Sequence, residues 1–111
     1  MRAYISIVLV FCLLLSCNRQ KKRILVFSKT KGYRHESIPD GKRALIELGK
    51  QNDFEVDTTE DASFFREDSL KKYRAIVFLN TTMDVLDPVQ QADFKRFIEA
   101  GGGFVGIHAA A

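Results

Sequence analysis

The folded part of this sequence has no excess of charge of either sign. The 111-residue chain carries 17 Lys and Arg against 14 Asp and Glu, a formal net charge of +3. Four of the basic residues precede residue 23, which leaves 13 basic and 14 acidic residues in the remainder. A nucleic-acid-binding domain is expected to present a basic face. The composition therefore excludes nucleic acid as the expected partner.

Phosphate-binding motifs are also missing. The glycine cluster at 101–103 precedes an apolar run instead of following one, and neither GxGxxG nor GxxxxGK[ST] occurs. The first apolar run of the domain ends in Ser28-Lys29-Thr30, without the paired acids of a phospho-receiver. These absences exclude the common nucleotide-binding and phospho-acceptor sites of α/β proteins.

No apolar run is long enough to span a bilayer, which takes about 20 residues. The longest, residues 3–15 (AYISIVLVFCLLL), has 12 apolar residues of 13 and follows Arg2. A short basic start and a core of this length are typical of a signal peptide. A buried helix or strand is the alternative, but the run has no amphipathic period, which favours membrane insertion.

The next residues, Leu14-Leu15-Ser16-Cys17, resemble a bacterial lipobox. The resemblance implies that residues 1–16 are a cleaved lipoprotein signal peptide and that Cys17 is lipidated. Residues 17–22 are polar or basic and are predicted to be a tether, whose charges could lie against anionic headgroups. We therefore expect an exported protein of the cell envelope, anchored by lipid to a bacterial membrane and facing the periplasm or the outside.

Cysteine is scarce, with only Cys12 and Cys17 in the chain. The first is predicted to leave with the leader and the second to be acylated, so the mature domain has neither a free thiol nor a disulfide. This excludes catalysis by a cysteine nucleophile and leaves the hydrophobic core as the source of stability.

Beyond the tether, short apolar runs alternate with segments of helical periodicity. Continuous runs predict buried strands, and an alternating run predicts a half-buried edge strand. A β-α-β-α-β-α-β order indicates an α/β fold, a three-layer sandwich with a mainly parallel sheet of the flavodoxin-like type, incomplete at residue 111. The predicted strands are 23–28, 54–58 (the edge strand), 75–79 and 104–107. The last is predicted to be a central strand, and either the chain is a fragment or this strand is only half packed.

The two prolines of the chain, Pro39 and Pro88, suit the first turns of helices. Ser37 and Asp40 are candidate caps for a helix that Gly49 or Asn52 can end, and Asp87 is a cap for the last helix. A short helix is predicted at 69–73. The apolar stripe predicted for the last helix comprises Val89, Ala92, Phe94, Phe97 and Ile98.

Both histidines follow predicted strands, where ligands of parallel α/β folds bind. If one strand lies between theirs, the backbones of His35 and His108 are on the order of 10 Å apart. With Glu36 they could perform acid/base chemistry or contribute ligands to a divalent metal, although no third ligand is evident and no cofactor is assigned. Two unrelated, hydrogen-bonded histidines are the alternative.

Other polar residues follow the same strands. Arg34 could anchor an anionic or hydroxylated ligand, or be a solvated loop residue. Asn80, Thr81 and Thr82 could hydrogen-bond sugar hydroxyls or an oxyanion, or form only a cap or turn.

The sequence contains the segments RILVFSKTKGYRHESIPDG (23–41), AIVFLNTT (75–82) and FKRFIEAGGGFVGIHAA (94–110). Together these three segments resemble the trehalose-utilisation, or ThuA-like, family. The resemblance covers residues 23–111 and implies a class I glutamine amidotransferase-like fold, of which this chain would be the N-terminal portion, since family domains are about twice as long. The family's association with disaccharides and keto-sugars implies a carbohydrate ligand.

Within the resemblance, Gly106-Ile107-His108 is similar to the strained turn that presents the nucleophilic cysteine of amidotransferases, with histidine in its place. His35 matches the family's histidine after the first strand. The expected site has His35 and His108 as catalytic residues; the expected substrate-binding residues are Arg34, Glu36, Asn80, Thr81 and Thr82. A non-catalytic carbohydrate-binding or scaffolding domain, or an inactive truncated fragment, remains open.

Overall fold

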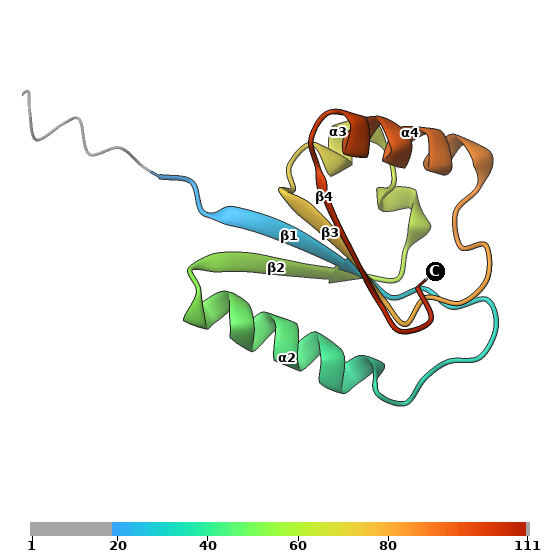
Figure 1. Ribbon diagram of the computed structural model, residues 1–111, viewed down its shortest axis with the longest axis horizontal. Coiled ribbons are helices and arrows are strands. Elements are labelled where there is room, and N and C mark those ends of the chain that lie inside the picture. The colour runs from blue at the N-terminus through green and yellow to red at the C-terminus, as the bar shows by residue number, and fades with distance from the viewer. Residues whose placement is uncertain (1–18, 111) are drawn as a thin grey trace, which may run out of the picture.

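The computed structural model describes residues 19–110, and their strands form one parallel sheet (Figure 1). The strand order is β2-β1-β3-β4, and each neighbouring pair is parallel. The predicted α/β fold is thus confirmed. The strands are β1 (Lys22–Phe27), β2 (Phe54–Thr59), β3 (Ala75–Leu79) and β4 (Gly103–Ile107), and the helices are α2 (Ile38–Gln51), the 3-10 helix η1 (Ala62–Phe64), α3 (Glu67–Leu70) and α4 (Pro88–Glu99).

Helices cover both faces of the sheet, as Figure 1 shows: α2 lies on one face, and α3 and α4 lie on the other. Side chains of a strand point alternately to the two faces. In β1, Phe27 belongs to the cluster under α3 and α4, whereas Val26 belongs to the cluster under α2. The three-layer arrangement follows from this alternation, because the central strands β1 and β3 present apolar side chains to both faces.

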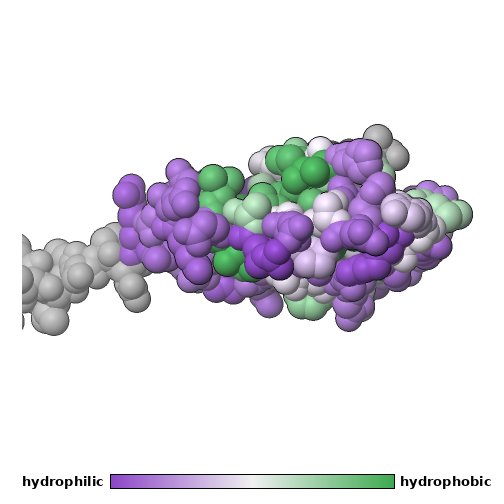
Figure 2. Space-filling model, turned by 90° about the horizontal axis from the view of Figure 1, so that it is seen from below, coloured by the Kyte–Doolittle hydropathy of each residue, from purple (hydrophilic) through white to green (hydrophobic). Residues whose placement is uncertain are grey.

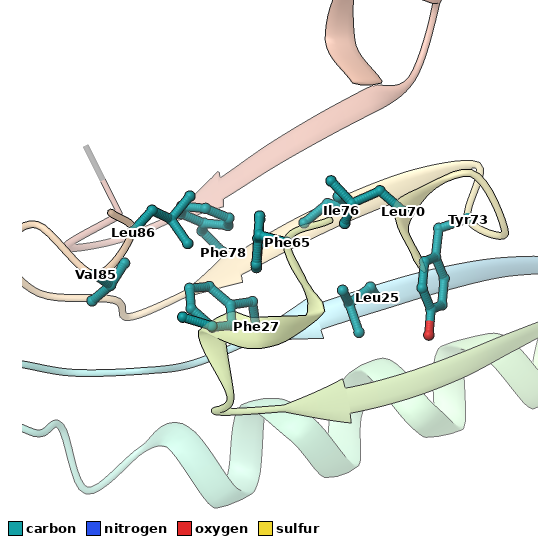
Figure 3. Close-up of a cluster of buried hydrophobic side chains, with 10 residues drawn as sticks. Leu25, Phe27, Phe65, Leu70, Tyr73, Ile76, Phe78, Val85 and Leu86 are labelled. Carbon is teal, nitrogen blue, oxygen red and sulfur yellow. The ribbon is translucent and has the colours of Figure 1, made fainter. Parts of the chain in front are cut away.

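Aromatic and aliphatic side chains together fill the face under α3 and α4 (Figure 3). Phe65 is fully buried, and its ring centroid lies 4.6 Å from that of Phe27 and 5.7 Å from that of Phe78. Phe94 of α4 stacks on Phe78 at 5.4 Å. Phe65 follows η1, an element that the sequence analysis did not predict, although Asp61 accepts a hydrogen bond from the Ser63 backbone as its cap.

The apolar stripe predicted for α4 is only partly correct. Phe94 and Phe97 pack against the core, but Val89 and Ile98 are 54% and 38% exposed. Asp93 is buried instead of these two residues. Its carboxylate accepts a hydrogen bond from the Glu67 backbone N at 3.2 Å and forms ion pairs with Arg66 and Arg96. Periodicity alone does not reveal such partners. The short helix, predicted at 69–73, begins two residues earlier at Glu67 and ends at Leu70.

Strand β4 lies at an edge of the sheet and not in its centre, which corrects the prediction of a central strand. Among residues 19–110 it pairs with β3 alone. Phe104 and Val105 are 47% and 48% exposed as a result. At the opposite edge lies β2, which was predicted to be an edge strand; its residues are half-buried or exposed, although the alternation is broken at Asp57, which is half-buried like Val56.

The last turn of α2 packs closely against the start of β2. A Cβ atom added to Gly49 would lie 2.7 Å from the Phe54 carbonyl oxygen, so only glycine fits there without a shift. Asp53 takes a positive φ of 56° in the turn between α2 and β2. Strand β1 begins at Lys22, within the predicted tether, and Lys21 pairs with Asp53. No helix among residues 19–110 has the length and apolar character needed to cross a bilayer.

Candidate functional site

Loops after β1, β3 and β4 meet at the carboxyl edge of the sheet, and Thr82 holds two of them together. Its backbone carbonyl accepts from Lys31 N at 3.1 Å. Its hydroxyl accepts from Gly32 N and donates to the Tyr33 carbonyl, both at 3.1 Å. Thr82 therefore positions the loop that carries His35. This observed role is a structural one, and the prediction that Thr82 contacts a ligand stays a prediction.

The two histidines are in contact. Strand β3 lies between β1 and β4, the arrangement on which the distance expected from the sequence depended. The ring centroids of His35 and His108 are 4.6 Å apart and nearly perpendicular, at 78°. Tyr33 packs edge-on against the His35 ring at 4.9 Å. The two histidines of the chain, which are 73 positions apart in the sequence, thus lie side by side.

The backbone is strained where this site is formed. His108 and Asn80 follow the adjacent strands β4 and β3, and both have positive φ, 58° and 50°. A left-handed conformation costs a residue with a side chain on the order of 1 kcal/mol, less for Asn. Such strain clusters at functional sites. The conformation of His108 matches the strained turn that the family resemblance implied.

A shallow cleft of about 530 Å³ opens beside the histidines. Leu79 and Ile107, the last residues of β3 and β4, line it with apolar surface. Five polar residues also line it, from the loops that follow β1, β3 and β4 and from the first turn of α2. They are His35, Ser37, Asp40, Asn80 and His108.

Asn80 is the most buried polar residue of this cleft, only 4% exposed. Its Nδ2 donates to Ser37 Oγ at 2.9 Å, whereas its Oδ1 is buried without a partner among the described residues. Ser37 is the N-cap residue of α2, but its side chain makes no capping hydrogen bond. The hydroxyl that the sequence analysis expected as a cap thus faces the site. Its role there was missed, because a serine before a Pro-containing helix start predicts a cap equally well.

The other predicted ligand contacts lie elsewhere. Arg34 forms an ion pair of 2.6 Å with Glu60, which also lies 3.4 Å from Lys42. Burial opposes ionisation of Glu60, but the Arg34 hydrogen bond and the Lys42 charge outweigh it and hold the pKa of this carboxyl below its usual value. Glu36 is exposed, with no ion pair within residues 19–110.

Thr81 is buried on the other side of the strand end. It lines a separate cavity of about 290 Å³ with Ala109 and Ala110. The structure therefore brings together His35, His108 and Asn80, and separates them from Arg34 and Thr81.

Metal coordination has two candidate ligands here, His35 and His108. No group of three or more His, Cys, Asp or Glu residues suited to a metal ion occurs in the described part of the chain. Imidazole is a common general acid or base, so acid/base chemistry on a bound ligand is what this pair of side chains offers.

Comparison with known proteins agrees with the fold. The family described as ThuA, trehalose utilisation, matches residues 23–111. The chain belongs to the ThuA family. A crystal structure of a ThuA-like protein from Bacteroides uniformis is similar, with 26% identity and a TM-score of 0.68. That match covers 80% of this chain but 36% of the other, so this chain spans about a third of the solved protein. No curated protein matches.

Proposed function

We propose that this ThuA domain binds a carbohydrate, a disaccharide or keto-sugar, in the cleft beside His35 and His108, and that the two imidazoles act on it as acid and base. The observation that carries the proposal is the contact of the two histidines, 4.6 Å apart, on a strained backbone. The broader role in trehalose utilisation comes from family membership.

The lining of the cleft suits a sugar. A sugar ring presents hydroxyl groups at its rim and C–H groups on its faces. Leu79 and Ile107 offer apolar contact, and His35, His108, Ser37 and Asp40 offer donors and acceptors. Ligand sites typically combine apolar walls with few polar groups. Asn80 also lines the cleft, and its Oδ1 is buried without a partner among the described residues, a feature that calls for an explanation in a native structure.

The proposal also includes export and lipid attachment at Cys17, which lies outside the described residues. The mass of the protein extracted from bacterial membranes tests this part. A mass that includes acyl chains and lacks residues 1–16 supports it, and an unmodified Cys17 contradicts it.

Calorimetric titration of the full-length protein with trehalose and a panel of disaccharides and keto-sugars tests the site. We expect His35→Ala and His108→Ala each to weaken binding at least about tenfold, the effect of one lost hydrogen bond to a charged or polarised group. Lys31→Ala, an exposed position on the same loop, is the matched control and should bind normally. Unchanged binding in both histidine variants would remove the site assignment.

Product analysis on the same panel decides whether the domain also catalyses. Turnover that the two histidine variants abolish supports acid/base chemistry. Binding without turnover by the wild type supports the second candidate, a carbohydrate-binding domain without catalysis.

A further inference from the structure

A second cluster of charged side chains lies at the amino edge of the sheet, at the opposite end of the strands from the histidine cleft. Two segments about 50 positions apart meet there: residues 21–23 at the start of β1, and residues 71–74 between α3 and β3. The backbone N of Arg74 donates to the Arg23 carbonyl at 2.8 Å. We call this cluster the basic edge. On the face shown in Figure 2, hydrophilic residues surround the point where the described chain begins.

The basic edge surrounds a cleft of about 610 Å³, larger than the one beside the histidines. Its lining contains a single acidic residue, Glu55. Six basic residues line it: Lys21, Lys22, Arg23, Lys71, Lys72 and Arg74.

Half of these charges are paired within the domain. Arg23 pairs with Glu55 and lies 3.5 Å from Asp57, Lys21 lies 3.2 Å from Asp53, and Lys71 lies 2.7 Å from Asp68. The other three are exposed and form no salt bridge within residues 19–110. They are Lys22, Lys72 and Arg74.

We propose that the basic edge docks on the anionic phospholipid headgroups of the membrane to which the chain is anchored. The inference rests on the lipid anchoring in the proposed function. Lys22 follows Cys17 by five positions, and a fully extended chain spans at most about 18 Å over that length. The anchor therefore keeps this edge, rather than any other, close to the lipid surface, at a high effective concentration.

The charges then select the orientation of the domain. A basic residue near an anionic leaflet favours the docked state by about fivefold, so Lys72 and Arg74 together contribute about 30-fold. Strands of five or six residues separate the two edges by roughly 20 Å, more than the Debye length of about 8 Å at physiological salt. Docking at the basic edge thus leaves the histidine cleft facing away from the membrane and open to soluble sugars.

Fluorescence quenching tests the orientation. The full-length protein is purified from bacterial membranes and reconstituted in vesicles of phosphatidylcholine, with or without phosphatidylglycerol. A fluorophore is placed at Gln51→Cys, beside the basic edge, or at Lys31→Cys, at the carboxyl edge, and a quencher is carried on the lipid. We expect stronger quenching at position 51 when phosphatidylglycerol is present, and none of this increase at position 31.

The variant Lys72→Gln/Arg74→Gln should abolish the increase, and so should high salt, which screens exposed charges. The matched control is Lys29→Gln/Lys31→Gln, which removes two charges at the carboxyl edge. With the fluorophore at position 51, this variant should retain the increase in quenching. Equal quenching on both lipids, or equal loss in the two double variants, would overturn the proposal. Loss caused by inorganic phosphate at constant ionic strength would also overturn it, by indicating a site for a free anion.

The anchor is tested separately by mass. If Cys17 proves unmodified, Cys12 and Cys17 are replaced by serine and vesicle flotation takes the place of quenching. The readout is then the difference in flotation between the two lipid compositions. If the wild type floats more with phosphatidylglycerol and Lys72→Gln/Arg74→Gln removes this difference, the basic edge docks on anionic lipid even without the anchor. If the wild type floats equally with both lipid compositions, the docking proposal is rejected.

Discussion

The amino and carboxyl edges of the sheet differ in how their buried polar groups are paired. At the amino edge, the Tyr73 hydroxyl donates to Asp57 at 2.8 Å, and Asp57 also lies 3.5 Å from Arg23. At the carboxyl edge, Asn80 is buried with its Oδ1 unpartnered, and His108 sits on a left-handed backbone. The first arrangement stabilises the fold, whereas the second leaves an unpaired acceptor and a strained backbone beside the histidine cleft.

The starts of the two long helices, both at the carboxyl edge, show the same contrast. Helix α4 has a complete capping box, in which Asp87 Oδ1 accepts from Gln90 N at 2.8 Å and Asp87 N donates to the Gln90 side chain. Helix α2 has no side-chain cap, because Ser37 Oγ accepts from Asn80 instead. One helix start is therefore committed to stability and the other to the site.

The largest expected effect on stability lies in a close contact with the backbone at the amino edge. Gly49→Ala places a Cβ 2.7 Å from the Phe54 carbonyl, and overpacking of this kind costs about 2–3 kcal/mol. Chemical denaturation measures the loss. Gly106→Ala is the control at the other end of the sheet, where the nearest atom would be 3.5 Å away, and we expect little change. Equal losses in the two variants would contradict the contrast in packing.

The Tyr73–Asp57 hydrogen bond should have the next largest effect. Tyr73→Phe removes a donor to a charged group, at a cost of about 1.5 kcal/mol. Burial, followed by the hydrogen bond to Asp57 and its charge, raises the pKa of Tyr73 to about 12. Because the folded pKa exceeds the ordinary value of 10, this contribution is complete below pH 10 and is lost as the pH rises to 12.

Denaturation of the wild type at a series of alkaline pH values should therefore show a loss of stability that is smaller in Tyr73→Phe. Tyr33→Phe, at an exposed tyrosine of the carboxyl edge, is the control and should follow the wild type. A decline of the same slope in Tyr73→Phe would show that other groups cause it.

Much of the fold was predictable because its signals are local. Strand β3 was predicted at its observed bounds, since Ala75–Leu79 is uniformly apolar, and both long helices begin beside a proline as predicted. Phe65 was missed because η1 is too short to show a period. The exposure of Phe104 was missed because a strand's place in a sheet depends on its neighbours, not on its own residues.

For the candidate site, the position of the two histidines was predictable from the sequence, but the contacts of the surrounding side chains were not. The rule that ligands bind at the carboxyl ends of parallel strands placed both histidines at one edge. The strand order that brings their rings together is a property of the whole chain. The ion pair of Arg34 with Glu60 and the bond of Asn80 to Ser37 link distant segments, so no local pattern announced them.

Removing each helix-start side chain sharpens the contrast between α4 and α2. Asp87→Ala removes the capping box and should lower the free energy of unfolding by about 1 kcal/mol, without affecting carbohydrate binding. Ser37→Ala removes the partner of Asn80 and should weaken binding of the carbohydrate. Denaturation and calorimetry on both variants check this. Weaker binding in Asp87→Ala, or normal binding in Ser37→Ala, would contradict the division of roles.

The smallest effect expected is a gain in stability. His108→Gly relieves a left-handed conformation, but glycine gains freedom in the unfolded chain, so the net gain is about 0.5 kcal/mol. The same substitution should abolish carbohydrate binding, because it removes one ring of the histidine pair. Asp53→Gly is the control at the amino edge, where φ is also positive, at 56°. The stability of Asp53→Gly should change as little as that of His108→Gly, but Asp53→Gly should bind the carbohydrate normally. If His108→Gly is instead destabilised, the His108 ring contributes to folding, and the strain at this edge is not held for the ligand.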